Sequence, residues 1–461
     1  MDHDTLTERY LDEIARSGVT AAETIGALRE QPLLESLRHG QYLPRPLFLG
    51  RRERETLHAD VENVRVALLG LPDRLFDGDL AAFARAVGAS EGMVSAAVRG
   101  RTGQMSSLTR ADLYLEASGF KLLELNLGSV VAGIENADIC RTLLRHPAIA
   151  GFAAEHDLGF TDTMRAQVES IFAETGLAPG SAPVIAIASD AGLYQRVSAF
   201  LHALVPRWAE LGLDAIPCEV DELQAAPGGL WIKGRRVDAV FRMFMLENVP
   251  SSGASPIDPV LDAAARGEVA VYTSIDGELY SSKVALALLS DHRHRPLFSA
   301  AELASIDRIV PWTRLVRPGP VTLEDGSTVE LMDYAVEHAS DLVLKPALLH
   351  GGEGIVPGWD SSLSQRAWQD HLAAACGQHY VLQRRVRPVP ELMPSATGET
   401  EPWIVTWGAF TILGEHGGIY IRGVPERTGH NVINFTAGAS VGAGLAVQAA
   451  GPQQRLCCTH A

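Results

Sequence analysis

One stretch of the chain, RADLYLEASGFKLLELNLGS at 110–129, constrains the fold more than any other. It contains two runs in which apolar and polar residues alternate with a period of two, which predicts two β-strands. The Ala-Ser-Gly sequence between the runs, at 117–119, suits a three-residue loop in which Gly119 takes the positive φ. The stretch is therefore expected to form a β-hairpin.

Polar residues share one face of this predicted hairpin. Pairing around the loop places Asp112 opposite Glu124 and Arg110 opposite Asn126, with apolar positions on the other face. Two carboxylates that face each other across a strand pair, about 5 Å apart, destabilise a sheet. A hard divalent cation removes this penalty, because carboxylate and amide oxygens are typical ligands of Mg²⁺. The hairpin face is therefore interpreted either as a solvated surface or as a metal site.

Composition limits the class of protein. The 461 residues are 46% hydrophobic and 21% charged, which is typical of a soluble globular chain with two or three packed units. The net charge is −17 and no basic run could follow a phosphate backbone, so nucleic-acid binding is not expected. No apolar run reaches the ~18 residues of a membrane span, and the charged start does not resemble a signal peptide. Five cysteines without C-x-x-C spacing favour reduced thiols and a cytoplasmic location.

Elsewhere the pattern predicts a mixed α/β chain. Residues 1–100 have apolar residues at helical spacing, and 184–220 reads as a strand, a helix and a strand, which is a βαβ unit. Strand patterns recur in LVLKPAL, YVLQRRV, IVTWGAFTIL and GGIYIRGV. Arg242 interrupts an apolar run, and a buried arginine requires an anionic partner. The Gly/Ala-rich segment 435–451 fits no element.

Two lysines accompany signals for anion binding. Lys345 ends a predicted strand and precedes a loop whose glycines would let backbone N–H groups approach a phosphate, namely Gly351, Gly352 and Gly354. Lys283 lies just inside a predicted helix that Ser281 or Ser282 caps, where an anion is favoured. The strand that contains Gln383 could present its backbone to an adenine edge. Each signal alone also suits an ordinary turn, first helical turn or strand, and the loop matches neither a Walker A nor a protein-kinase motif.

Together and in this order, these blocks resemble the circularly permuted branch of the ATP-grasp ligases. That branch includes the synthetase half of glutathionylspermidine synthase and peptide ligases of the pheganomycin-ligase type. The resemblance runs from about residue 105 to residue 440, and the spacing R-x-D-x₁₁-E-x-N is its most specific part. It implies an α/β ATP-grasp architecture, circularly permuted, with ATP and Mg²⁺ as cofactors.

The resemblance also implies a role for each candidate residue. Asp112, Glu124 and Asn126 would hold Mg²⁺, and Lys283 and Lys345 would grip ATP phosphates. Arg110 would steady the transferring phosphoryl group, and Arg422 would face the phosphate or a substrate carboxylate. The remaining nucleotide-binding candidates are the loop glycines and the strand glutamine: Gly351, Gly352, Gly354 and Gln383.

The implied division of the chain has five parts. They are a helical N-terminal region (1–100), the metal-binding half of the core (101–175), a Rossmann-like domain (176–274), a nucleotide-binding lid subdomain (275–400) and a C-terminal return to the core (401–461). The sequence leaves the oligomeric state open, with a homodimer as one possible assembly.

The implied reaction joins a carboxylate and an amine through an acyl phosphate, with release of ADP and phosphate. Amino acids or peptides are the expected substrates, in natural-product biosynthesis of the antibiotic kind. Glutathione is disfavoured, because Val130-Val131-Ala132 stand where the glutathione-using synthases have small polar or thiol side chains. Three alternatives stay open: a glutathionylspermidine-synthase-like ligase acting on a polyamine, a phosphotransferase that forms no amide, and a non-catalytic ATP-binding protein.

Overall fold

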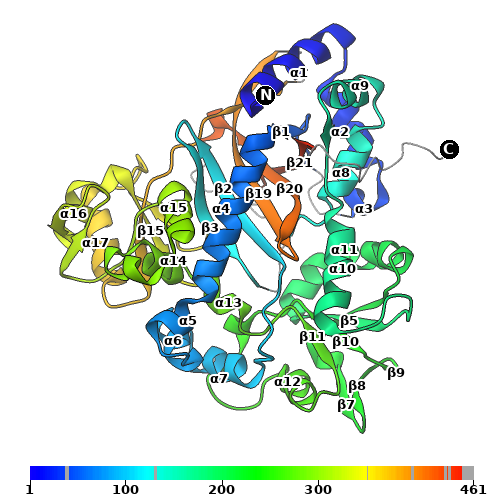
Figure 1. The fold of residues 1–461 in the computed structure, drawn as a ribbon, viewed down its shortest axis with the longest axis vertical. Helices are drawn as coiled ribbons and strands as arrows, with labels where there is room; N and C mark the ends of the chain where they lie inside the picture. The colour runs from blue at the N-terminus through cyan, green and yellow to red at the C-terminus, as the bar shows by residue number, and fades with distance from the viewer. Residues whose placement is uncertain are drawn as a thin grey trace.

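The computed structural model describes residues 1–36, 41–128, 132–349, 351–395, 399–429, 433 and 438–448. These ranges form a mixed α/β protein, as the sequence predicts, built on three larger sheets (Figure 1). The main sheet has six strands in succession: β1 (Leu47–Leu49), β21 (Ser440–Val447), β20 (Glu415–Pro425), β19 (Thr400–Ile412), β2 (Thr109–Glu116) and β3 (Gly119–Asn126). Two further strands pair with β19 and β21, respectively: β18 (Glu391–Pro394) and β4 (Leu158–Gly159).

The expected hairpin is formed by β2 and β3. Asp112 pairs with Glu124 and Arg110 pairs with Asn126, which confirms the predicted register. The predicted three-residue loop is wrong, because Gly119 already pairs with Glu116 and leaves two residues in the turn. Gly119 does have the expected positive φ, at 108°.

A β-bulge at Leu123 reconciles the short turn with the predicted register. Beside the turn, Leu113 pairs with Leu122, and continuing that register would place Leu123 opposite Asp112. Leu123 is instead the extra residue on β3, so the pairing shifts by one and Glu124 comes to face Asp112. The bulge thus determines which side chains share the polar face.

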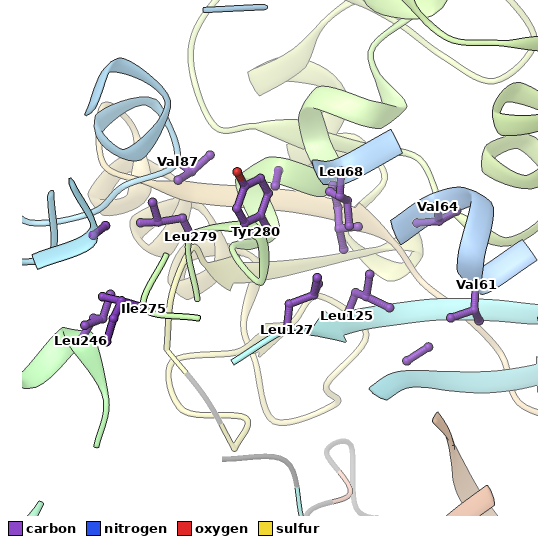
Figure 2. Packing of buried hydrophobic residues seen from close by; sticks show 14 of the residues in the cluster. Val61, Val64, Leu68, Val87, Leu125, Leu127, Leu246, Ile275, Leu279 and Tyr280 are labelled. Atoms are coloured by element: carbon purple, nitrogen blue, oxygen red, sulfur yellow. The ribbon is translucent and has the colours of Figure 1, made fainter. Parts of the chain in front are cut away.

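Helix α4 (Arg51–Leu69) covers the other face of the main sheet, which it crosses in Figure 1. Figure 2 shows Val61, Val64 and Leu68 of this helix beside two leucines of the hairpin. Leu125 lies in β3, and Leu127 directly follows that strand. All five side chains are at most 1% exposed. Burial of a side chain of this size stabilises the fold by about 1.5–3 kcal/mol. This apolar face is a buried core that fixes the position of the hairpin.

The strands of the main sheet that come first and last along the chain, β1 and β21, are neighbours and pair in parallel. The second of these comes from the Gly/Ala-rich segment, for which no element was predicted. A Cβ on Gly442 or Gly444 would lie 2.9 Å from Leu43 or 2.7 Å from Ile419, so close packing requires the glycines. Residues 1–100 are mainly helical, as expected, but β1 belongs to the main sheet. The helices of the first 175 residues, besides α4, are α1 (His3–Ser17), α2 (Ala21–Arg29), α3 (Pro32–Glu35), α5 (Leu71–Leu75), α6 (Leu80–Ala86), α7 (Glu91–Arg99), α8 (Asn136–Leu143), α9 (Pro147–Glu155) and α10 (Thr163–Thr175).

A parallel sheet in the order β11-β10-β5-β6 confirms the predicted βαβ unit. Arg242, at the end of β10, is fully buried and donates to Glu278 Oε1 at 2.5 Å, which is the anionic partner that its burial requires. The elements of this unit are β5 (Val184–Ser189), α11 (Ala191–Glu210), β6 (Asp214–Glu219), β7 (Gln224–Ala226), β8 (Gly229–Ile232), β9 (Arg235–Arg236), β10 (Ala239–Arg242), α12 (Asp258–Ala265) and β11 (Ala270–Tyr272).

An antiparallel sheet in the order β12-β17-β15-β16 organises a third unit. Its helix α15 is fastened to α4, because the buried Asp60 accepts hydrogen bonds from Ser305 Oγ at 2.7 Å and Arg308 Nη1 at 2.5 Å. The elements of this third unit are α13 (Gly277–Tyr280), α14 (Lys283–Ser290), α15 (Ala300–Ile309), β12 (Thr313–Leu315), β13 (Pro320–Thr322), β14 (Thr328–Glu330), α16 (Leu331–Glu337), β15 (Leu342–Pro346), β16 (Val356–Pro357), α17 (Gln365–Ala375) and β17 (Tyr380–Arg384).

None of the helices in the described ranges combines the length and the hydrophobicity that a membrane span requires.

Candidate active site

The face of the main sheet opposite α4 carries charged side chains and is called the charged face here; its members are Arg110, Asp112, Glu124, Asn126 and Arg422. Arg110 Nε and Nη2 donate to the two carboxylate oxygens of Asp112 at 2.7 and 3.0 Å. Arg422 Nη2 and Asn126 Nδ2 donate to Asp112 Oδ2 at 2.7 and 3.4 Å. Burial raises the pKa of Asp112, but the charges of Arg110 and Arg422 outweigh it and hold the pKa well below its usual range.

A glycine gives Arg110 its place on this face. Gly408 of β19 lies opposite Asp112, and a Cβ there would lie 3.1 Å from Arg110 Cδ. The guanidinium can therefore lie across the sheet, with its Cζ 5.8 Å from the ring centre of Tyr420. Neither Gly408 nor Tyr420 was singled out by sequence reasoning, because their roles depend on strand pairing.

Lys283 links the third unit to the charged face. It begins α14 after Ser282, whose hydroxyl accepts from Val284 N, which confirms the predicted cap. Lys283 is 3% exposed, with Nζ 3.7 Å from Glu124 Oε2 and 2.9 Å from the carbonyl oxygen of Leu349. A lysine predicted at a helix start thus lies beside a carboxylate predicted on a strand.

Lys345 on β15 also approaches the hairpin. Its Nζ donates to Gln383 Oε1 on β17 at 2.6 Å and to the carbonyl oxygen of Leu123, the bulge residue, at 3.5 Å. Burial, which is the largest cause, and the charge of Lys283 together lower the pKa of Lys345 to about 8, while the charge of Glu124 opposes the change. Two buried lysines whose positive charges lie near each other form a site that an anion would stabilise.

The predicted glycine loop joins β15 to β16. Gly351, Gly352 and Gly354 have φ values of 63°, 83° and 69°, in the left-handed region that side-chain-bearing residues rarely adopt. The three glycines are therefore required by the backbone of the loop. His350, between Lys345 and this loop, lies outside the described residues, as do Val130 and Val131, so the expectation about glutathione stays a prediction.

The charge balance of the region determines what it can hold. Four cationic side chains face two carboxylates: Arg110, Arg422, Lys283 and Lys345 against Asp112 and Glu124. Arg422 Nε is also buried, and no acceptor for it lies within the described residues. Buried charge without a partner is unfavourable, so the excess of two positive charges suits a polyanion such as a nucleotide triphosphate.

The oxygen donors fit a hard cation. Glu124, with a side chain 27% exposed, has Lys283 as its ion-pair partner at 3.7 Å, and Asn126 directs only its Nδ2 at Asp112 and the Arg110 carbonyl. Counting only His, Cys, Asp and Glu, no group of three gathers as a metal site in the chain as described. A metal here would therefore use the amide oxygen of Asn126 beside the two carboxylates, which is the donor chemistry that Mg²⁺ accepts.

Comparisons with known proteins show the fold. The chain is similar to a glutathione synthetase-like effector from Globodera pallida in its apo form, with a TM-score of 0.56 and 11% identity over 95% of this chain and 97% of the other. A putative gamma-glutamylcysteine synthetase from Methylobacillus flagellatus KT gives a TM-score of 0.36 at 11% identity, over 83% of this chain and 84% of the other. No family model and no curated protein matches the chain. The overall fold is thus shared with a glutathione synthetase-like protein and is consistent with an ATP-grasp-like architecture, while the circular permutation and the domain boundaries stay predictions.

Proposed function

We propose that the chain is an ATP-dependent carboxylate–amine ligase. The observation that carries the proposal is the buried excess of positive charge where Lys283 and Lys345 meet the charged face. Phosphoryl transfer requires mainly positioning and charge neutralisation, and this region offers both without a dedicated nucleophile. The fold shared with a glutathione synthetase-like protein and the resemblance to ATP-grasp ligases agree with this reaction class.

Each residue then has a task in the first step. Lys283 and Lys345 bind the phosphates of ATP, and Gln383 orients Lys345 through its 2.6 Å hydrogen bond. Glu124, Asn126 and Asp112 would hold Mg²⁺, which would supply charge neutralisation at the phosphates. Arg110 steadies the γ-phosphoryl group as the substrate carboxylate attacks it, which gives an acyl phosphate and ADP.

In the second step a neutral amine attacks the acyl carbon and displaces phosphate, leaving an amide. Arg422, with its unpartnered Nε, binds the carboxylate of the acid substrate or the transferred phosphate. The loop of Gly351, Gly352 and Gly354 closes over the site and keeps water from the acyl phosphate, which would otherwise hydrolyse.

The acid and the amine are proposed to be amino acids or short peptides, joined in the cytoplasm for a natural product. Glutathione is not proposed as the donor, because of the apolar Val130-Val131-Ala132 segment. A phosphotransferase would use the same cations, but it would leave a phosphorylated product and no amide.

The test incubates the protein with ATP, Mg²⁺ and pairs drawn from the amino acids and their dipeptides, and a parallel set contains glutathione with spermidine. ADP release is measured and the products are identified by mass spectrometry. The proposal expects stoichiometric free phosphate only when an acid and an amine are both present. A phosphorylated product without an amide would contradict the ligase assignment, and efficient glutathionylspermidine formation would contradict only the substrate assignment.

A further inference from the structure

One buried carboxylate near the charged face has no counter-ion. Glu135 directly precedes α8 and is 3% exposed. Within the ranges that the structure describes it forms no ion pair, and no side chain donates a hydrogen bond to it. Asp112, at a similar depth, is held by two guanidinium groups. A buried carboxylate without such partners is unfavourable unless another group supplies the missing charge.

The segment that carries Glu135 is pressed against the charged face. Arg110 Nη1 donates to the carbonyl oxygen of Ala132 at 2.5 Å. Gly133 has a φ of 105° and lies on the ring of Tyr420, where a Cβ would be 2.5 Å from Cγ. Burial raises the pKa of Tyr420, and the negative charge of Glu135 raises it further. Glu135 therefore lies next to the residues assigned to phosphoryl transfer, yet it pairs with none of them.

The surroundings of Glu135 suit proton exchange near neutral pH. Burial raises the pKa of Glu135 to about 7, while the backbone N–H groups of residues 133 and 135 and the charge of Arg110 act against the rise. The other titratable groups that face it are Tyr420 on β20, Asp138 on α8 and Tyr42 before β1. A general base works best when its pKa lies near the working pH.

We propose that Glu135 receives the amine co-substrate, binding its ammonium form and accepting a proton from it before the nitrogen attacks. The inference rests on the proposed ligase function and names a residue for its second step. The chemistry selects an amine that is cationic in solution, because its positive charge is attracted to a buried carboxylate that forms no ion pair within the described ranges. Arg422 and Arg110, both cationic, serve the acid and the phosphoryl group instead.

The step balances. The ammonium group R–NH₃⁺ gives one proton to the carboxylate of Glu135, leaving R–NH₂ and a carboxylic acid. The nitrogen lone pair then forms a C–N bond to the acyl carbon, and the C–O bond to phosphate breaks. The nitrogen loses a second proton to the departing phosphate, which leaves as HPO₄²⁻. Glu135 finally returns its proton to solvent.

Hydroxylamine separates the two steps, because it is largely neutral at pH 7.5 and traps acyl phosphates without a base. Glu135→Gln should form hydroxamate from ATP and the acid within about threefold of the wild-type rate. With the amine that the wild-type protein uses best in the amino-acid panel, amide formation should fall by about 100-fold or more. The deficit should shrink towards alkaline pH, because the rate of the variant should rise with the fraction of neutral amine, whereas the wild-type rate should level off above about pH 7.

A matched control is Glu174→Gln on α10. Glu174 also has a pKa that burial raises, but Ser107 hydrogen-bonds it through N at 2.8 Å and Oγ at 2.5 Å. Its substitution should leave the ratio of amide to hydroxamate formation unchanged. Glu135→Gln should melt at or above the wild-type temperature at pH 8, because it removes a buried charge.

Three outcomes would overturn the inference. Equal loss of hydroxamate and amide formation in Glu135→Gln, or loss of neither, would show that Glu135 does not serve the amine. A melting temperature well below that of the wild-type protein would give Glu135 a structural role instead. If the wild-type protein makes neither hydroxamate nor amide from any acid in the panel, the proposed function itself fails, and that result is distinct from the other two.

Discussion

The two faces of the main sheet use neighbouring residues for opposite purposes. Leu125 points to the apolar face, where α4 buries it to 1% exposure, and Glu124 points to the charged face, where Lys283 approaches it. Leu125 packs within a cluster of buried apolar side chains, whereas the cations of the charged face, counted together with Lys283 and Lys345, outnumber its carboxylates. The contrast implies that substitutions at Leu125 affect mainly the stability of the fold, whereas substitutions at the adjacent Glu124 affect mainly the reaction.

The largest effect is expected on the charged face. Glu124→Gln keeps the size of the side chain but removes a metal ligand and its charge, so turnover should fall by about 100-fold to 1000-fold. The melting temperature should stay within a few degrees of the wild-type value, because no core contact is lost. ADP release at saturating Mg²⁺ measures the effect, and near-normal turnover would show that Glu124 does not hold the metal.

The next effect belongs to the apolar face. Leu125→Ala leaves a cavity beneath α4 and should lower the free energy of unfolding by about 2–5 kcal/mol. ADP release per folded molecule should be unchanged, since no charged side chain moves. Urea unfolding followed by circular dichroism measures the stability. A variant that keeps its stability and loses activity would contradict the separation of the two faces.

The lysines test whether the charged face needs the third unit. Lys283→Met and Lys345→Met should each weaken binding of a non-hydrolysable ATP analogue by about 1–3 kcal/mol, the scale of a lost hydrogen bond to a charged group. Lys121→Met is the control, because Lys121, on β3, likewise donates from its Nζ to a carbonyl oxygen, that of Arg308, at 2.6 Å. Calorimetric titration gives the affinities, and unchanged binding in both variants would refute the phosphate assignment.

A smaller effect follows from the pKa of Lys345, which burial lowers to about 8. Phosphate binds the protonated lysine, so affinity for the ATP analogue should fall about tenfold between pH 7 and pH 9, as the free protein loses this proton. The stability of the unliganded protein depends on pH in the opposite direction. Below about pH 8 the buried positive charge of Lys345 lowers the free energy of unfolding, and this destabilisation disappears as the pH rises towards 10.5. Lys345→Met should abolish the pH dependence of binding, and a variant that keeps it would assign the titration to another group.

Much of the fold could be predicted from local patterns. Alternation at 110–127 indicated the hairpin, and the apolar run at 184–189 indicated the first strand of the parallel sheet. The helix cap before Lys283 and the positive φ of Gly119 also followed from residue type alone. These features depend on residues close together in the sequence, whose conformational preferences determine the local structure.

The rest depends on partners far along the chain. The Gly/Ala-rich sequence gives no signal for the strand at 440–447, because its glycines are required for close packing against Leu43 and Ile419, which lie far away along the chain. The bulge at Leu123 has no local signal, and neither does the room that Gly408 leaves for Arg110. Glu135 was missed for the same reason, since only the folded chain shows that its carboxylate is buried beside the charged face without a counter-ion.

The central claim is that the charged face, together with the two lysines, binds Mg²⁺ and ATP. The most direct measurement is a crystal structure with Mg²⁺ and a non-hydrolysable ATP analogue. We expect phosphates contacted by Lys283 and Lys345, with the metal on Asp112, Glu124 and Asn126 and the base beside the strand that carries Gln383. A nucleotide bound elsewhere, or phosphates that contact neither lysine, would contradict it.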